Sequence, residues 1–186
     1  MIRTIRVSYR LRLTPRVVSV ANLVLTGFMG TGKTTVGRLL AERLGFDFVD
    51  SDALIVDRHG PIAEIFAEHG EQEFRRIERE VAAELAGADR LVIATGGRML
   101  LDPANAEALA HTGRIVCLTA SVDTILRRVA PDGTAANRPL LAGHDVRQRV
   151  EQLLAERQRG YAAFEQVSTD DRSPSEICDE IIRHVR

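Results

Sequence analysis

The amino-acid sequence predicts an α/β fold with a five-stranded parallel sheet and helices on both of its faces. From Asn22 onward, short apolar runs alternate with longer segments of helical periodicity, which is the pattern of repeated βαβ units. The chain has 186 residues, of which 45% are hydrophobic, and it contains no internal repeat and no low-complexity tract. One compact domain over residues 22–186 is therefore expected.

Five short apolar runs are the predicted strands. They are rich in aliphatic residues and are bounded by glycine or polar residues, as buried parallel strands are. These runs cover residues 22–26, 46–49, 91–95, 114–118 and 164–168.

Eight segments with helical periodicity lie between and after these strands, and glycines separate many of them. The predicted helices cover residues 33–44, 53–59, 62–68, 71–86, 103–110, 122–129, 146–163 and 175–185. Residues 131–143 contain proline, glycine and small side chains without periodicity, so we expect a mobile loop there that acts as a lid.

Residues 1–21 form an arginine-rich segment without any acidic residue, which superficially looks like a transit peptide. It lacks the apolar core of a secretion signal. A disordered extension, or a start codon placed too early, is the alternative, and we expect a disordered extension.

Charge and composition exclude several classes of protein. The net charge of -1 and the pI near 6.5 give no general attraction to nucleic acid, so a charged ligand must be held by a local site. No apolar run reaches the length of about 18–20 residues that spans a bilayer. Cys117 and Cys178 fit neither a zinc spacing nor a CxxC motif, which favours buried thiols in a reducing compartment. We therefore expect a cytoplasmic, monomeric protein.

The strongest motif is GFMGTGKT at residues 27–34, which matches GxxxxGK[ST] between a predicted strand and a predicted helix. Its backbone N–H groups and the positive end of the helix suit a triphosphate. Lys33 is expected to reach the β and γ phosphates of ATP, and the Thr34 hydroxyl to bind Mg²⁺. The predicted nucleotide-binding residues of this loop are Gly30, Thr31, Gly32, Lys33, Thr34 and Thr35.

The rest of the chain must distinguish a kinase from other nucleotide-hydrolysing proteins, because all of them share this loop. Lys33 is the only lysine, which excludes the guanine-reading N-K-x-D motif of GTPases. Motor ATPases need a longer chain. The size and the late arginine-bearing loop favour a kinase of a small metabolite or of a nucleoside monophosphate.

Two carboxylates, Asp50 and Asp52, follow the second predicted strand and should overhang the ligand crevice at the carboxyl end of the sheet. We expect Asp50 to hold Mg²⁺ through water, and Asp52 to orient or deprotonate the attacking hydroxyl. Taken alone, this pattern more often caps a helix.

Two further patterns point to an acceptor site. Arg75 and Glu78, three residues apart on a predicted helix, can pair and fix a guanidinium that suits a carboxylate, although a solvated charged face is equally compatible with the spacing. Gly96 and Gly97 end the third predicted strand and permit close approach to a ligand, or they form a tight turn.

Together, GFMGTGKTT, DSD, EQEFRRIE, the GG turn and NRPLL resemble the shikimate kinase family in order and spacing over residues 22–186. The resemblance implies a three-layer P-loop kinase fold with a lid, and transfer of the γ-phosphoryl group of ATP to the 3-hydroxyl of shikimate in aromatic amino acid biosynthesis. It implies that Asp52, Arg75, Gly97 and Arg157 bind the substrate.

The resemblance also implies further nucleotide contacts. Arg138 of NRPLL matches a lid arginine that reaches the phosphates and, with Lys33 and Asp52, is an expected catalytic residue. Arg128, Arg172 and Pro174 match positions where the family packs adenine, although ordinary surface residues would give the same pattern.

The chain departs from the family pattern at two places. Arg98 stands where the family has a third glycine; it either points to solvent or enters the acceptor pocket as an anion binder, and a positive φ there would cost about 1 kcal/mol. Arg159 and Gly160 replace a usual Pro-Leu before Tyr161.

These departures leave alternatives open. Arg98 makes a kinase of a related polyol acid or cyclitol plausible. A non-catalytic sensor of nucleotide and shikimate-like ligands, or a nucleoside monophosphate kinase, would share parts of the pattern.

Overall fold

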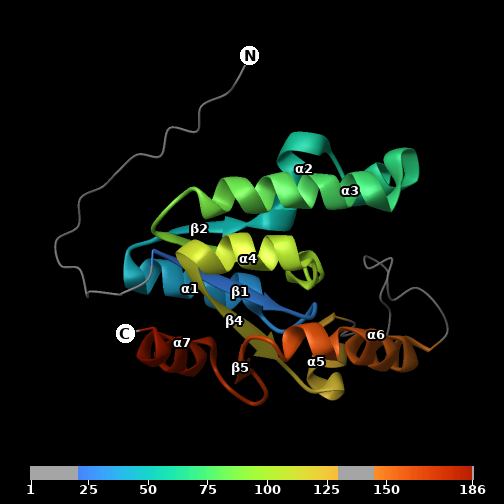
Figure 1. The fold of residues 1–186 in the computed structure, drawn as a ribbon. Helices are drawn as coiled ribbons and strands as arrows, with labels where there is room; N and C mark the ends of the chain where they lie inside the picture. The colour runs from blue at the N-terminus through green and yellow to red at the C-terminus, as the bar shows by residue number, and fades with distance from the viewer. Residues whose placement is uncertain (1–20, 130–144, 186) are drawn as a thin grey trace.

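The sheet has five parallel strands, as predicted. The computed structural model describes residues 21–129 and 145–185, and the strand order is β2-β3-β1-β4-β5 (Figure 1). Every neighbouring pair is parallel. The strands are β1 (Asn22–Gly27), β2 (Asp47–Asp50), β3 (Leu91–Ala94), β4 (Gly113–Thr119) and β5 (Glu165–Ser168).

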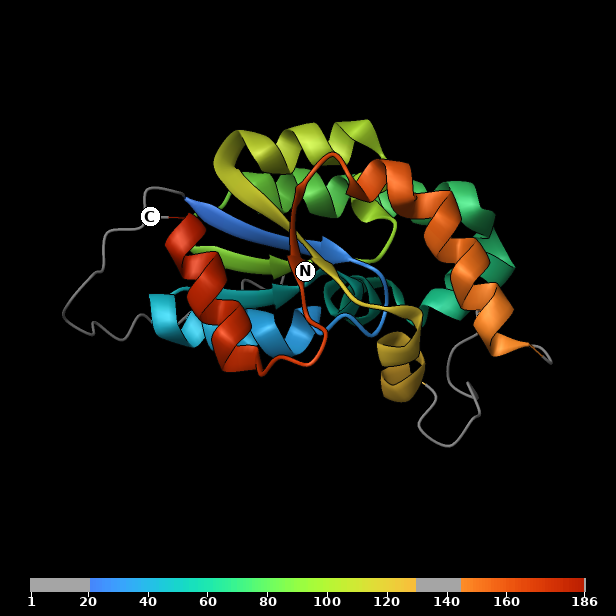
Figure 2. The ribbon, with the colours of Figure 1, turned by 90° about the horizontal axis from the view of Figure 1, so that it is seen from below.

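Helices cover both faces of the sheet, which gives the predicted three layers (Figure 2). On one face, Leu23 and Leu25 of β1 pack in a core with α1 (Lys33–Leu44) and α7 (Pro174–His184). On the other, Val24 packs in a core with α3 (Ile62–Ala86) and α4 (Pro103–Thr112). The side chains of β1 alternate between the two cores because successive residues of a strand point to opposite faces.

Two helices lie beyond the carboxyl ends of the strands, α5 (Val122–Val129) and α6 (Val146–Tyr161) (Figure 2). A third core, which includes Phe28, Ile125 and Val150, fixes them against the loop that follows β1. The end of the sheet where parallel α/β folds bind ligands is therefore flanked by helices.

The observed helices differ from the prediction near this end. α2 (Ser51–His59) begins two residues earlier than expected, because the Asp50 side chain accepts hydrogen bonds from the backbone N–H groups of Asp52 and Ala53. The predicted helices 62–68 and 71–86 are both present; they lie in one element, α3, which breaks at Gly70 with φ 79° and ψ 176°. A short 3-10 turn, η1 (Met99–Leu101), was not predicted.

Some predictions fall outside the described residues, including the extension up to residue 20, the lid at 131–143 and Arg138. Cys117 and Cys178 are buried, as expected, and burial raises the pKa of each thiol to about 11. Among the helices within residues 21–129 and 145–185, none combines the length and apolar character needed to cross a membrane.

Candidate active site

The glycine-rich loop joins the end of β1 to the start of α1. Lys33 Nζ lies back along the loop and donates to the carbonyl oxygens of Gly27 at 2.8 Å and Phe28 at 2.9 Å. The Thr31 hydroxyl donates to the same Phe28 oxygen at 2.8 Å. Gly32 precedes α1 and offers no side-chain cap. The start of this helix therefore presents backbone N–H groups that suit an anion.

Thr34 and Asp50 meet beside this loop, although they come from α1 and the end of β2. The Thr34 hydroxyl donates to Asp50 Oδ2 at 3.0 Å, while Asp50 Oδ1 caps α2. Asp50 thus performs the capping role that its pattern suggests, and it also contacts the residue predicted to bind the metal. The pair offers one hydroxyl and one carboxylate oxygen on the same side of the loop.

Asp52 lies against the glycine turn that follows β3. A Cβ atom on Gly96 would lie 2.4 Å from Asp52 Oδ1, so only glycine allows the two segments to approach this closely. Burial, and then the charge of Asp50, raises the pKa of Asp52, while Lys33 and Arg75 act in the opposite direction. Asp52 is therefore a partly buried carboxylate within the electrostatic reach of both cations.

Arg75 and Glu78 form the predicted ion pair on α3. Arg75 Nη1 donates to Glu78 Oε2, and the Glu78 side chain is only 3% exposed. Burial raises the pKa of Glu78, and Arg75 counteracts this effect. Burial works against the charge of Arg75, but the carboxylates of Glu78 and Glu71 raise its pKa. The guanidinium is held by two carboxylates rather than by solvent, so the alternative of a solvated face does not describe it.

Gly97 and Arg157 meet at the other side of the turn. Arg157 on α6 is 5% exposed, and its Nη1 lies 3.3 Å from the position that a Cβ on Gly97 would take. Its guanidinium stacks over the Phe28 ring, 5.1 Å from the centroid. The Tyr161 hydroxyl donates to the Gly97 carbonyl at 2.5 Å, and burial raises the pKa of Tyr161. A buried arginine thus lies directly beside the turn.

Arg98 does not have the strained backbone that the sequence suggested. Its φ is -115°, an ordinary value for any residue. The side chain is 51% exposed, and its Nη1 donates to Glu71 at 3.1 Å. Arg98 therefore pairs with a carboxylate of α3.

The second departure has a packing explanation. A Cβ on Gly160 would lie 2.4 Å from a methyl carbon of Leu101, so the small residue makes room for the leucine of η1. Gly160 thus packs against Leu101 and not against Arg157.

Of the residues predicted to pack adenine, Arg128 lies on α5, and Arg172 and Pro174 lie just before and at the start of α7. Arg128 on α5 donates to the Gly30 carbonyl at 3.1 Å and to the Thr169 carbonyl at 2.9 Å, so it connects the loop to the segment after β5. Arg172 pairs with Glu180 of α7 at 2.6 Å. Pro174 is the first residue of α7. Only Arg128 among these three has a hydrogen bond to the glycine-rich loop within the described structure.

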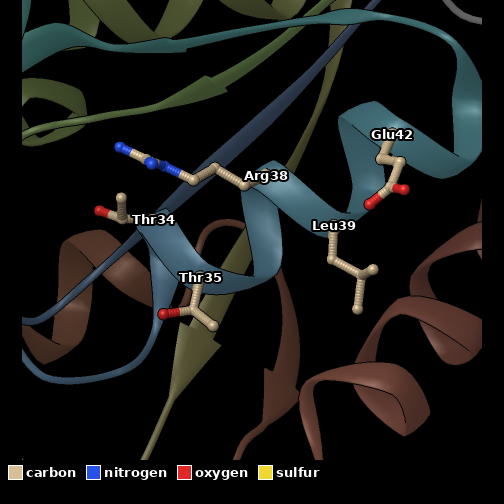
Figure 3. Close-up of a pocket in the computed structure, with 5 residues that line it drawn as sticks. All are labelled: Thr34, Thr35, Arg38, Leu39 and Glu42. Carbon is tan, nitrogen blue, oxygen red and sulfur yellow. The ribbon is translucent and has the colours of Figure 1, made fainter.

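A surface cavity of about 450 Å³ lies along α1 (Figure 3). Its lining begins with Thr34 and Thr35 at the helix start and continues with Arg38, Leu39 and Glu42. It includes none of the residues predicted to bind the acceptor. The cavity therefore adjoins the predicted triphosphate site and is separate from the acceptor site.

Sequence reasoning missed two contributors to this region. Glu71 contacts both Arg75 and Arg98, and the i,i+4 spacing of Glu71 and Arg75 on a predicted helix could have indicated the first contact. Ser51 accepts a hydrogen bond from the Gly96 N–H at 2.9 Å. No sequence signal indicates that contact, because the two residues are 45 positions apart.

The arrangement places a phosphate-binding loop, a partly buried carboxylate and two arginines around the ends of β1, β2 and β3. It can hold an anionic nucleotide at the loop and a hydroxylated carboxylate beside Asp52, with the arginines opposite the carboxylate of the acceptor.

Known proteins are similar to this chain in sequence and in fold. The shikimate kinase family model matches residues 29–186. A shikimate kinase from Symbiobacterium thermophilum is 46% identical over 168 residues, which cover 89% of this chain and 96% of that protein. One from Geobacter metallireducens is 44% identical over 165 residues, covering 88% and 90%. The structure of a shikimate kinase from Acinetobacter baumannii in complex with shikimate matches with a TM-score of 0.81 and 36% identity, covering 90% of this chain and 94% of that one.

Proposed function

Because this chain belongs to the shikimate kinase family, we propose that it transfers the γ-phosphoryl group of ATP to the 3-hydroxyl of shikimate. The observation that carries this proposal is the position of Asp52. Its carboxylate lies against Gly96, within the electrostatic reach of Lys33 on the phosphate side and Arg75 on the acceptor side. A hydroxyl at Asp52 would thus lie between the phosphoryl donor and the group that holds the acceptor.

On the donor side, the residues bind and orient the nucleotide. The start of α1 and Lys33 hold the phosphate oxygens, and Arg128 holds the loop against the segment that follows β5. The backbone N–H groups at the start of α1 and the Arg128 contacts are held by the fold, so they need little reorganisation when charge moves onto the transferred group.

The Thr34 and Asp50 oxygens suit Mg²⁺. This ion takes oxygen ligands, keeps several waters, and is usually held by one or two protein groups together with substrate phosphates. Within the described residues, no group of three or more metal-binding side chains is present, which is compatible with a site that phosphates complete. When bound, Mg²⁺ would neutralise charge on the phosphates.

On the acceptor side, Arg75 and Arg157 bind the carboxylate and Asp52 contacts the reacting hydroxyl. Asp52 orients that hydroxyl and accepts its proton as the bond to phosphorus forms. Tyr161 and Ser51 hold the turn of Gly96 and Gly97 in place. Catalysis therefore depends on positioning more than on covalent chemistry. We also propose that the protein is cytoplasmic and that it acts without a macromolecular partner.

The test is ADP release by the purified protein with ATP, Mg²⁺ and shikimate, beside quinate, gluconate, a cyclitol, nucleoside monophosphates and no acceptor. We expect turnover with shikimate that Asp52→Asn reduces by about 10²–10⁴-fold. Turnover with another acceptor only would replace shikimate in this proposal. Shikimate binding without turnover of any acceptor would indicate a sensor and would refute the proposal that the protein is a kinase.

A further inference from the structure

Glu71 connects two arginines that lie on different elements. It is the first residue after the break in α3 at Gly70. Its Oε1 accepts hydrogen bonds from Arg75 Nε at 3.2 Å, from Arg75 Nη2 at 3.0 Å and from Arg98 Nη1 at 3.1 Å. Arg98 directly follows Gly97, so this carboxylate joins α3 to the turn at the acceptor site.

The contacts of Arg75 with Glu71 and Glu78 leave two of its N–H groups for a ligand. A guanidinium has five N–H groups. Glu71 accepts from Nε and Nη2, and Glu78 accepts from Nη1. Among the described contacts, each terminal nitrogen therefore retains one N–H, and a ligand carboxylate can accept hydrogen bonds from these groups. The two glutamates thus orient Arg75 without using all five of its N–H groups.

The same contacts surround Arg75 with negative charge, which Arg98 offsets. Glu71 and Glu78 place two negative charges on one guanidinium, which would disfavour an anionic acceptor at Arg75. Arg98 adds a second positive charge at Glu71 and makes the four-residue cluster neutral. Hydrogen bonding from Arg75, followed by the charge of Arg98, lowers the pKa of Glu71, so this carboxylate is ionised at neutral pH.

We propose that Arg98 is a positioning residue for the acceptor: through Glu71, it keeps Arg75 oriented and available to the acceptor carboxylate. This inference rests on the proposed function. It explains how a long cation can stand in place of a glycine next to the acceptor site, because the side chain is directed to Glu71. Arg98 then affects the affinity for the acceptor and leaves the chemical step unchanged.

The expected effect is moderate, because both side chains of the Arg98–Glu71 pair are about half exposed. Exposed ion pairs change an equilibrium by about two- to fivefold. Arg98→Gln should raise the KM and the Kd for shikimate by this factor, while kcat and the KM for ATP stay at the wild-type values. The effect should shrink in 0.5 M salt, because salt screens exposed charges.

A double-mutant cycle tests the route through Glu71. The cycle compares wild type, Arg98→Gln, Glu71→Gln and the double variant, with shikimate affinity measured by calorimetry and by steady-state kinetics. Arg76→Gln is the matched control, because Arg76 is also on α3 and pairs with the exposed carboxylates of Glu73 and Glu80. We expect no change in shikimate KM for this control.

If Arg98 acts through Glu71, the effect of Arg98→Gln on shikimate affinity disappears when Glu71 is already glutamine. An equal effect in both backgrounds would overturn the route through Glu71, and a wild-type KM for Arg98→Gln would overturn the role of Arg98. Absence of shikimate turnover by the wild-type protein is a different result, which counts against the proposed function.

Discussion

At the scale of single residues, the active site contains charges that the fold must stabilise at a cost. Asp52 is the clearest case, since burial and the charge of Asp50 raise its pKa. A group whose folded pKa exceeds its unfolded pKa stabilises the fold while it is protonated. That contribution is lost as the pH rises through the folded pKa. At neutral pH, the Asp52 carboxylate therefore lowers the free energy of unfolding.

Asp52→Asn should make the protein more stable while it lowers turnover. The amide is neutral, so it removes the cost of burying a charge, and we expect the Tm to rise by about 2–4 °C, which corresponds to about 1 kcal/mol in a domain of this size. Differential scanning calorimetry at pH 7 measures this change. Asp57→Asn on the exposed side of α2 is the matched control and should leave both Tm and turnover unchanged. A lower Tm for Asp52→Asn would contradict the argument.

Activity should depend on pH through the same carboxylate, and it should be lost as the pH falls. Asp52 must be ionised to accept a proton, so kcat/KM should fall on the acid side with a midpoint above the usual aspartate value of about 3.9. A pH–rate profile of the wild-type protein, measured where the Tm stays well above the assay temperature, shows this midpoint. A midpoint at or below the usual value would remove Asp52 as the proton acceptor.

The residue scale also marks the limit of what could be predicted from the sequence. The motif around Lys33 and the Arg75–Glu78 pair could be predicted, because local spacing determines them. The contact of Arg98 with Glu71 could not, because it joins residues 27 positions apart on two elements. Its orientation depends on how the turn after β3 lies against α3, which no local pattern encodes.

At the scale of elements, the break in α3 immediately precedes Glu71 and Arg75, which we propose to position and bind the acceptor. Gly70 has φ 79° and ψ 176°, and Gly60, at the end of α2, has φ 85° and ψ -176°. Both lie in a region of backbone conformation that is open essentially only to glycine. The two predicted helices on either side of Gly70 are confirmed as separate helical segments, since glycine signals in the sequence report this conformation well.

Gly70→Ala should destabilise the protein through its backbone. No atom lies within 4 Å of the position that the new Cβ would occupy, so the effect is a conformational cost of about 1–3 kcal/mol and a fall in Tm of about 3–10 °C. Shikimate KM should rise as well, because Glu71 and Arg75 follow the break.

Gly87→Ala is the control for this change. Gly87 ends the same helix at φ -80°, which alanine adopts readily, so thermal unfolding of that variant should match the wild type within about 1–2 °C. Equal Tm values for the two variants would show that the break at Gly70 is not strained for alanine.

At the scale of the whole molecule, the alternation of strands and helices made the fold class predictable, and the parallel sheet with both faces covered confirms it. The end of the sheet at which a ligand should bind follows from the same topology, because the carboxyl ends of parallel strands lie together. The short 3-10 turn and the end of α6 were not predicted correctly, because their boundaries depend on tertiary contacts such as Leu101 against Gly160.

Nucleotide binding should stabilise the whole domain by mass action. At a concentration of 100 times its Kd, a non-hydrolysable ATP analogue with Mg²⁺ adds about 2.7 kcal/mol and raises the Tm by about 5–10 °C. Addition of EDTA should abolish turnover and reduce this shift, and Asp50→Asn should reduce the difference between the Mg²⁺ and EDTA conditions. Identical shifts with and without Mg²⁺ would argue against a metal held by Thr34 and Asp50.

The position of Lys33 has a practical consequence for chemical labelling. It is the only lysine in the chain, and its Nζ lies on the carbonyl groups of the glycine-rich loop. Amine-acylating reagents therefore find one side-chain target, and that target lies at the proposed nucleotide site. The mass increase of a single peptide would report nucleotide occupancy directly, without any engineered probe.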